Sequence, residues 1–274
     1  MSASLTLAPL PAQVLPFLTA LADESRLAII RLLARTDLRV SELGERLHLP
    51  QNVVSYHLKK LRALDILHDH RSSNDARDVY YRIDLDRLQA LYQAAGAVLH
   101  PGLAPAPAPA GVDSWRERPL RVLFLCTHNS ARSQLAEGIL RHLGRENVEV
   151  YSAGSEPTAI HPDTLRLLAE LGADPARHYA KALDQFAGQS FDYIITVCDR
   201  VRDRCPVFPN DPERIHWSIP DPVTVAAADA RWAAFCAVRQ DLYTRIRYLL
   251  TLPHPATGQR LQMPVPGAAQ EGRP

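Results

Sequence analysis

The chain has 274 residues, of which 46% are hydrophobic and 22% are charged, a balance that is ordinary for a globular protein. Its net charge of +1 excludes a general basic field for nucleic acid, so any DNA contact would come from a local surface. No apolar run approaches the ~20 residues that span a bilayer, and the N-terminal MSASLTLAPLPAQV lacks the basic leader and apolar core of a signal peptide. We therefore expect a cytoplasmic protein that contacts no membrane.

A proline- and alanine-rich stretch divides the chain. The segment PGLAPAPAPAG carries no charge and is typical of an extended, semi-rigid linker that buries no core. The Pro- and Gly-containing end of the chain is typical of a disordered tail. Together with the length, which favours two domains, this predicts an N-terminal domain at 1–99, a linker at 100–118, a C-terminal domain at 119–252 and a disordered tail at 253–274.

Before the linker, apolar residues recur at the three- and four-residue spacing of helices. Two such helices are followed by a short third one, the turn LHLP and a fourth helix with a polar face. A polar tip flanked by β-forming residues then predicts a hairpin, and an amphipathic helix ends the domain. These elements lie at 14–22, 25–35, 40–47, 51–67, 68–83 and 84–99, and their order predicts a mostly α winged helix-turn-helix domain.

The helix QNVVSYHLKKLR is the candidate for reading DNA. In a helix-turn-helix the second helix lies in the major groove, where polar side chains reach base edges and lysines reach phosphates. Arginines in the hairpin tip suit the adjacent phosphates. A small helical domain with a solvated polar face is the alternative. The candidate DNA-binding residues are Gln51, Asn52, Ser55, Tyr56, His57, Lys59, Lys60, Arg71 and Arg77.

The stretches LADESRLAIIRLLA, LPQNVVSYHLKKLRALDIL and DARDVYYRI resemble the ArsR family of metal-responsive repressors. The resemblance implies operator binding as a homodimer through the first and last helices of the domain. Arsenite-sensing members carry a Cys-x-Cys pair where this chain has Arg39 and Ser41, and the whole domain contains no cysteine. It therefore cannot bind As(III) through thiolates in that way. His68 and His70 fall in the predicted hairpin, where we expect them to be solvated, so no metal site is predicted.

After the linker, buried strands alternate with helices, which predicts an α/β domain with a parallel sheet covered by helices. RVLFL, VEVYSAG and FDYIITV have the length and residue types of buried strands. Two of the helices end in glycine, and a long helix closes the domain. Strands are expected at 121–125, 148–154 and 191–197, and helices at 130–144, 161–172 and 227–250.

The loop LCTHNSARSQ follows the first of these strands and precedes a helix. Backbone N–H groups and the helix dipole favour a bound oxyanion there, and Arg132 adds a guanidinium suited to two oxygens of a tetrahedral anion. The same field is expected to lower the pKa of Cys126, to whose thiolate Ser133 can donate. The loop thus presents a nucleophile to an oxyanion, the alternative being a buried cysteine at a strand end. The oxyanion-binding residues are Thr127, His128, Asn129, Ser130, Ala131 and Arg132.

Three further cysteines lie in the same domain. Cys198 follows a parallel strand as Cys126 does, so both are expected at the carboxyl edge of the sheet, where ligands bind. Cys205 comes seven positions later, after a short charged segment that can rearrange. Half a metal site is the alternative, but no other Cys and no flanking His pair supplies the remaining ligands. Cys236 lies in an apolar helix and is expected to pack.

The run LCTHNSARSQLAEG, followed by VYSAG, TVCDRVRDRCP and WSIPDP, is similar to the low-molecular-weight protein tyrosine phosphatase superfamily and to its arsenate reductases. The resemblance implies that the loop cysteine attacks arsenate held by the loop arginine, with the Asp of IPDP as general acid. The second cysteine then attacks the adduct, and the third moves the disulfide to a pair that thioredoxin reduces. No tightly bound cofactor is expected. The implied catalytic residues are Cys126, Arg132, Ser133, Cys198, Cys205 and Asp221.

Two loop residues depart from the family pattern. His128 stands where many relatives have Gly, which can change loop geometry or substrate preference, and Ala131 stands where some have a further cysteine. Asn129 and Ser152 correspond to residues that shape the loop in the family.

We interpret the chain as an ArsR-like regulator fused to a thioredoxin-coupled arsenate reductase. The redox or oxyanion state of the reductase is expected to bias operator binding through tethering and dimer geometry. One alternative is a phosphomonoesterase of the low-molecular-weight tyrosine phosphatase type fused to a DNA-binding domain, which would not use Cys198 or Cys205. Another is a regulator whose catalytic domain serves only as a sensor.

Overall fold

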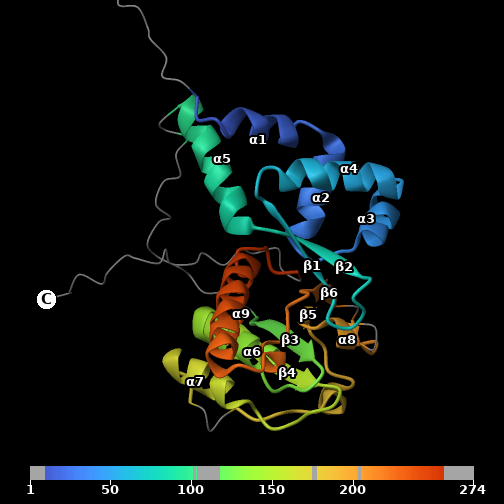
Figure 1. Ribbon diagram of the computed structural model, residues 1–274. Coiled ribbons are helices and arrows are strands. Elements are labelled where there is room, and N and C mark those ends of the chain that lie inside the picture. The colour runs from blue at the N-terminus through green and yellow to red at the C-terminus, as the bar shows by residue number, and fades with distance from the viewer. Residues whose placement is uncertain are drawn as a thin grey trace, which may run out of the picture. The chain divides into compact units, whose positions relative to one another are not determined.

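The computed structural model describes residues 10–100, 103, 118–174, 178–202, 205–210 and 212–255. These residues form two compact units: the first contains most of the residues before the predicted linker, and the second contains those after it together with Arg35–Asp37 and Arg71–Tyr80 (Figure 1). Nearly all of the predicted linker at 100–118 and most of the predicted tail at 253–274 lie outside the described residues. No helix in the described part of the chain has the length and apolar character needed to cross a membrane.

The N-terminal unit is a helical domain with a two-stranded hairpin, as the sequence predicted. Its elements are α1 (Val14–Leu21), α2 (Glu24–Leu33), α3 (Val40–Leu47), α4 (Gln51–Arg62), β1 (Leu67–Arg71), β2 (Val79–Ile83) and α5 (Leu85–Leu99). The core of the unit is apolar and gathers one face of each helix, with Phe17, Ile29 and Leu61 fully buried. Such burial, rather than helix propensity, stabilises helices this short.

Local signals explain where these helices begin and end. The side chain of Asp23 accepts from the backbone N–H of Arg26 at 2.8 Å and caps the start of α2. Asp84 does the same for α5 through the N–H of Arg87, also at 2.8 Å. His48 ends α3 in the left-handed region, with φ of 55°, which turns the chain toward Pro50 and α4.

The C-terminal unit is built on a four-stranded parallel sheet in the order β4-β3-β5-β6. The strands are β3 (Leu120–Cys126), β4 (Val148–Gly154), β5 (Tyr193–Thr196) and β6 (Glu213–His216). The parallel sheet confirms the predicted α/β class. β6 was not predicted, because its sequence ERIH is short and half charged.

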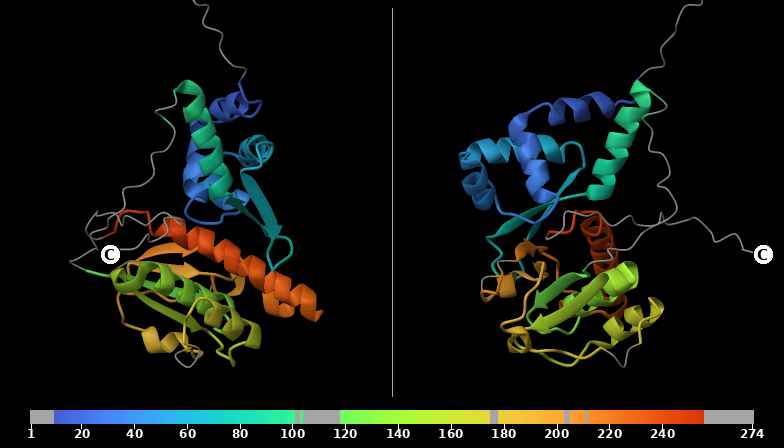
Figure 2. Two further views of the ribbon diagram at one scale, coloured as in Figure 1. Left: turned by 90° about the vertical axis from the view of Figure 1, so that its left-hand side faces the viewer. Right: turned by 180° about the vertical axis from the view of Figure 1, so that it is seen from behind.

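Helices pack around this sheet to form an apolar core. α6 (Arg132–Gly144) contacts β3 and β4, and α9 (Ala228–Leu249) packs against α6, as the views from other sides also show (Figure 2). The remaining helical segments are α7 (Pro162–Glu170), α8 (Asp199–Arg202) and the 3-10 turns η2 (Arg145–Asn147), η4 (Leu183–Phe186) and η5 (Pro222–Thr224). Every residue of β5 is buried, as expected for a strand inside a parallel sheet.

The strand order places the site. From β3 the chain crosses to β4 on one side, and it later returns to β5 on the other side of β3. Such a switch point opens a crevice at the carboxyl ends of the two central strands. Cys126 ends β3, and Cys198 follows β5 by two residues, so both thiols lie at that edge.

Candidate active site

The loop after β3 surrounds the sulfur of Cys126 with hydrogen-bond donors. Ser133 Oγ lies 2.9 Å from Cys126 Sγ, and the backbone N–H of Asn129 donates to the same sulfur at 3.1 Å. Cys126 is 3% exposed, and Asn129 and Ser133 are fully buried. The loop therefore holds one nucleophilic atom at the start of α6, where the helix N-terminus favours negative charge.

Asn129 is the centre of the buried polar network behind the loop. Its backbone has φ of 48°, the left-handed region that a non-glycine residue adopts only when its surroundings support it. Its side-chain amide donates to Ser133 Oγ and to Ser152 Oγ, both at 2.8 Å. Its amide oxygen accepts from Gln134 Nε2 at 2.9 Å. These contacts give a physical basis for the predicted loop-shaping role of Asn129 and Ser152.

Gly154, at the end of β4, lies directly against the loop backbone. A Cβ atom added there would be 2.6 Å from the carbonyl oxygen of Thr127 and 2.8 Å from the nitrogen of Asn129. Both neighbours are backbone atoms, so neither can move without moving the loop. The backbone N–H groups of Ser155 and Glu156 then bond the Cys126 and Thr127 carbonyls. The glycine of VYSAG is thus part of the site.

Arg132 and Asp221 pair with each other in this structure. Arg132 Nη2 lies 2.5 Å from Asp221 Oδ2, and its Nη1 donates to the carbonyl oxygen of Ile219 at 2.9 Å. Arg132 is 6% exposed. The predicted anion-binding and acid groups are therefore brought together next to the loop, with the guanidinium engaged by the carboxylate. An incoming oxyanion would compete with Asp221 for this arginine.

A second thiol lies beside the loop. Thr127 Oγ1 lies 3.4 Å from Cys198 Sγ, and Cys198 is 2% exposed. Cys205, by contrast, is partly exposed and packs at the margin of the core. All four cysteines are reduced, and Cys236 packs against the core as predicted.

The expected lowering of the Cys126 pKa is wrong for this structure. Burial raises the pKa of the thiol above its ordinary value, and the nearby Cys198 raises it further. Arg132, the Ser133 hydroxyl and the Asn129 N–H act in the opposite direction but do not outweigh burial. The sequence shows which loop groups can donate hydrogen bonds to the thiol. How far the thiol is removed from solvent depends on the packing of the folded domain.

The other loop residues have structural contacts of their own. The carbonyl oxygen of Ser130 accepts from the backbone N–H of His161 at 3.1 Å and from Thr164 Oγ1 at 2.9 Å. The carbonyl oxygen of His128 accepts from the N–H of Thr158 at 3.0 Å. Ala131 is buried at the N-cap of α6. These bonds hold the rim of the loop from outside.

The predicted DNA-binding residues of α4 divide between its two faces. The exposed ones are Gln51, Asn52, Ser55, Tyr56, Lys59 and Lys60. His57 is only 8% exposed, with its Nδ1 3.8 Å from Asp23 Oδ1, so its side chain is not available to contact DNA. It lies on the same helix face as the buried Val54 and Leu58.

The arginines of the hairpin tip are exposed and engaged locally. Arg71 donates to the carbonyl oxygen of Ala76 at 2.9 Å. Arg77 pairs with Asp75 at 2.7 Å, and this pairing lowers the pKa of the Asp75 carboxyl to about 2. A phosphate would have to take Arg77 from Asp75, so Arg77 is a weaker candidate for a DNA contact than the lysines of α4.

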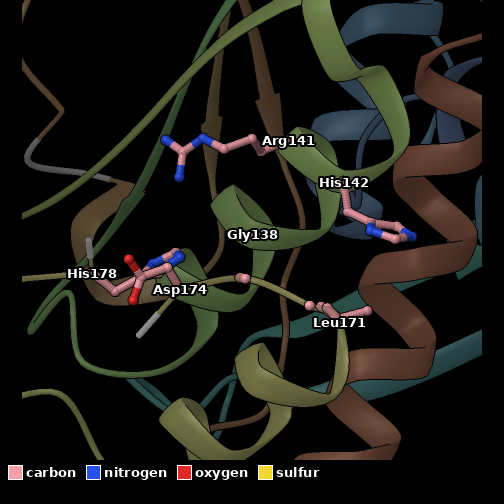
Figure 3. A pocket seen from close by; sticks show the side chains of 8 residues that line it. Gly138, Arg141, His142, Leu171, Asp174 and His178 are labelled. Atoms are coloured by element: carbon pink, nitrogen blue, oxygen red, sulfur yellow. The ribbon is translucent and has the colours of Figure 1, made fainter. Parts of the chain in front are cut away.

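A separate pocket of about 290 Å³ lies near the C-terminal half of α6 (Figure 3). Arg141 and His142 extend from that helix, while Asp174 and His178 come from the segment after α7. Burial lowers the pKa of His178, whose Nδ1 lies 3.0 Å from Gln134 Oε1. Through Gln134 the pocket is connected to Asn129 of the loop. Among the described residues, no group of three or more His, Cys, Asp or Glu side chains is arranged to hold a metal ion.

Several residues that support the loop were not predicted. Gln134 contacts Asn129 of the loop and Glu137 contacts Ser152 behind it. Both are buried polar residues on a helix, which is a signal that the sequence carries. Lys181 comes from a distant segment, and no local pattern marks it, whereas Gly154 ends the VYSAG motif.

Comparisons with known proteins agree with this geometry. Residues 121–262 match the family of low molecular weight phosphotyrosine protein phosphatases, and residues 23–69 match the bacterial regulatory proteins of the arsR family. The arsenate reductase of Halalkalibacterium halodurans is 36% identical over 127 residues, which are 46% of this chain and 91% of that protein. The arsenate reductase of Bacillus subtilis is 32% identical over 127 residues, again 46% of this chain and 91% of that protein.

A solved structure of a thioredoxin-dependent arsenate reductase from Corynebacterium glutamicum is 24% identical, covers 81% of this chain and 94% of that one, and has a TM-score of 0.39. The family match spans more than half of this chain, and the reductases of known sequence are covered over nearly their full length. The chain therefore belongs to the low molecular weight phosphotyrosine protein phosphatase family, with an arsenate reductase domain in its C-terminal half and an ArsR-type helix-turn-helix domain before it.

Proposed function

We propose that the chain reduces arsenate to arsenite through a relay of Cys126, Cys198 and Cys205, with thioredoxin as the reductant, and that its N-terminal domain binds operator DNA. The observation that carries the reductase proposal is the second buried thiol, Cys198, in contact with Thr127 of the nucleophile loop. A phosphatase needs only one cysteine, whereas a reductase must also dispose of two electrons.

In the first step the Cys126 sulfur attacks arsenic. Arsenate takes the guanidinium of Arg132 from Asp221 and also binds the loop N–H groups. The released Asp221 carboxylate takes up the proton that the Cys126 thiol loses as it attacks, and donates that proton to the departing hydroxyl, which leaves as water. A thiolate arsenic(V) adduct on Cys126 remains. Substrate binding thus frees the general acid at the moment when it is needed.

In the second step Cys198 attacks Cys126 Sγ. A disulfide forms between the two sulfurs, the sulfur–arsenic bond breaks, and its electron pair stays on arsenic, which leaves as arsenite. Cys205 then attacks Cys198, so that Cys126 is released as a thiolate and the disulfide moves to Cys198–Cys205. A thioredoxin dithiol reduces this pair by exchange. Because Cys205 is partly exposed, it is the member of the relay that thioredoxin can reach. A relay of free thiols needs a reducing compartment, which supports a cytoplasmic location.

The N-terminal domain is proposed to act as a homodimer on DNA. α4 presents its polar, lysine-bearing face to solvent. Apolar side chains on α1 and α5 are exposed, among them Leu15 at 62%, Tyr92 at 70% and Leu99 at 69%. α1 and α5 contact each other, and large exposed apolar side chains on both helices favour an interface in which a second copy of the chain buries them.

The test is consumption of NADPH by the purified chain with thioredoxin and thioredoxin reductase, with and without arsenate. Arsenate-dependent oxidation should disappear in Cys126→Ser and Cys198→Ser, and Cys205→Ser should stop after about one turnover. Cys236→Ser is the matched control and should keep full activity, because Cys236 only packs. Absence of turnover, together with hydrolysis of a phosphate ester that survives Cys198→Ser, would overturn the reductase proposal and favour a phosphomonoesterase.

A further inference from the structure

The tip of the hairpin, Arg71–Tyr80, belongs to the second compact unit, where it is bonded to a buried carboxylate. Asp199 directly follows Cys198, begins α8 and is 5% exposed. Its Oδ2 accepts from the hydroxyl of Ser72 at 2.7 Å and from the backbone N–H of Ser73 at 3.2 Å. The residue next to the second thiol of the relay therefore holds the hairpin tip directly.

The same carboxylate is also fixed through its other oxygen. Asp199 Oδ1 lies 3.1 Å from His216 Nε2 and accepts from the hydroxyl of Ser218, and both of these residues are buried. Burial by itself raises the pKa of the Asp199 carboxyl, but hydrogen bonds from these two side chains and from Ser72 hold that pKa well below its ordinary value. Asp199 is therefore ionised at neutral pH, and it depends on all of its donors for stability in a buried position.

Ser72 organises the turn at the end of the hairpin. The carboxylate of Asp199 can only accept, so the Ser72 hydroxyl donates to it. The oxygen of that hydroxyl accepts from the backbone N–H of Asn74 at 3.0 Å and from that of Asp75 at 3.4 Å. Asp75 in turn pairs with Arg77 at 2.7 Å. The arrangement of the whole turn thus depends on one hydroxyl that Asp199 holds in place.

The helix α8 lies between the last two cysteines of the relay and is only one turn long. Its residues, Asp199–Arg202, are too few to stay helical through their own hydrogen bonds, so contacts with the rest of the unit must hold them. The contacts of Asp199 are at its start. At its end Arg202 Nη1 donates to the hydroxyl of Tyr80 at 2.8 Å. Both ends of α8 are therefore bonded to the hairpin tip.

We propose that the hairpin tip is a redox-sensitive element: when the disulfide between the last two cysteines of the relay forms, Asp199 leaves Ser72 and the turn at the tip loses its order. In the reduced chain Cys198 Sγ lies 3.4 Å from Thr127 Oγ1. To bond Cys205, that sulfur must turn away from the nucleophile loop, and the peptide that joins Cys198 to Asp199 must turn with it. The proposal rests on the thiol relay proposed above.

The relay itself supplies this oxidation. When the Cys205 thiolate attacks the Cys126–Cys198 disulfide, one sulfur–sulfur bond forms, another breaks, and Cys126 leaves as a thiolate. The two electrons have by then passed to arsenic. The hairpin tip carries Arg71 and Arg77, the predicted phosphate contacts of the hairpin. The redox state of the relay therefore reaches a candidate DNA-binding segment within one compact unit.

The test is hydrogen exchange of the backbone amides at the hairpin tip, followed by mass spectrometry of peptides from the full-length chain. Cys126→Ser combined with Cys236→Ser leaves only Cys198 and Cys205 to pair. The azo compound diamide oxidises them by taking up their two protons and two electrons, and peptide masses verify the disulfide. Because this oxidation needs neither arsenate nor thioredoxin, it is independent of arsenate turnover.

In the oxidised chain the N–H groups of residues 73–75 should exchange about tenfold faster or more than in the reduced chain. One of them loses its bond to Asp199, and the other two are bonded to a Ser72 oxygen that Asp199 no longer fixes. A peptide of β3 should keep its protection, which distinguishes release of the tip from general unfolding.

Ser72→Ala should give residues 74–75 the same fast exchange in the reduced chain, because it removes the hydroxyl that organises the turn. Ser73→Ala is the matched control: Ser73 contacts Asp199 through its backbone N–H, which alanine keeps, so slow exchange should persist. Oxidation of Ser72→Ala should add little at residues 74–75, because both changes break the same connection.

Unchanged exchange at residues 73–75 in a chain whose disulfide is verified would overturn this proposal and leave the reductase proposal standing. Equal exchange in Ser72→Ala and Ser73→Ala would overturn it as well. Failure of diamide to join Cys198 to Cys205 would overturn both proposals, because the relay needs that bond too.

Discussion

Burial and the neighbouring Cys198 raise the pKa of the Cys126 thiol above its ordinary value. A raised thiol pKa means that the folded chain keeps a proton which the unfolded chain has already lost at the same pH. The free energy of unfolding must then fall as the pH rises through the ordinary thiol pKa, and it keeps falling until the folded pKa is reached.

We therefore expect the urea midpoint of the reduced chain to fall above about pH 8.5, with a slope of at most about 1.4 kcal/mol per pH unit from this thiol. Cys126→Ser should flatten the fall. Burial also raises the pKa of Cys205, and it raises that of Tyr193 to about 12, so part of the fall remains in the variant. Identical slopes for the two proteins would show that Cys126 titrates normally.

Position 154 requires glycine because its backbone lies close to the backbone of the loop. Gly154→Ala would place its methyl group 2.6 Å from the Thr127 carbonyl oxygen and force the loop to move. Displacement of reacting groups by about 1 Å can cost about a hundredfold in rate, so we expect arsenate turnover to fall by about that factor while the domain stays folded.

Gly172→Ala is the matched control for this prediction. Gly172 has φ of 73° and no atom within 4 Å of an added Cβ, so the substitution costs conformational strain alone. Thermal unfolding should detect a loss of about 1 kcal/mol, with turnover unchanged. Equal turnover of both variants would contradict the role given to Gly154.

The exposed face of α4 is expected to separate base readout from phosphate binding. Asn52→Ala should reduce the preference for the operator over other DNA by about 1–3 kcal/mol. Lys60→Ala should instead weaken binding to all sequences and reduce the salt slope by about one. Fluorescence anisotropy with operator and scrambled duplexes at several salt concentrations distinguishes the two effects. Wild-type behaviour of both variants would exclude α4 as the reading helix.

The spacing of apolar residues, together with the Gly, Pro and capping residues between elements, made most helices and strands predictable. RVLFL is apolar throughout and leads into the loop, so the strand, the thiol and the following helix could be placed in order. The prediction that His57 contacts DNA conflicts with its spacing from Val54 and Leu61, which puts it on the buried face of the helix. β6 and the pairing of Lys181 with Glu137 were not predictable, because both depend on segments that meet only in the folded sheet.

The distribution of thiols constrains how arsenic can influence DNA binding. All four cysteines lie after residue 120, and the ArsR-type domain contains none. A signal that depends on thiol chemistry must therefore arise in the reductase domain and change the equilibrium between DNA-binding states of the other domain. Such coupling is a free energy shared by the two sites, so it must act in both directions.

We accordingly expect the affinity of the full chain for its operator to change by about tenfold, within the usual range of coupling energies, when arsenate oxidises the Cys198–Cys205 pair. Gel shifts of the reduced and arsenate-treated protein measure this change, and Cys126→Ser, which cannot be oxidised by arsenate, should show none. Reciprocity adds a second check. If an oxyanion changes the affinity of the reduced chain for operator DNA by some factor, operator DNA should change the Kd for that oxyanion by the same factor. Equal operator affinity in every redox state would mean that the fusion only concentrates the reductase near its operator by tethering.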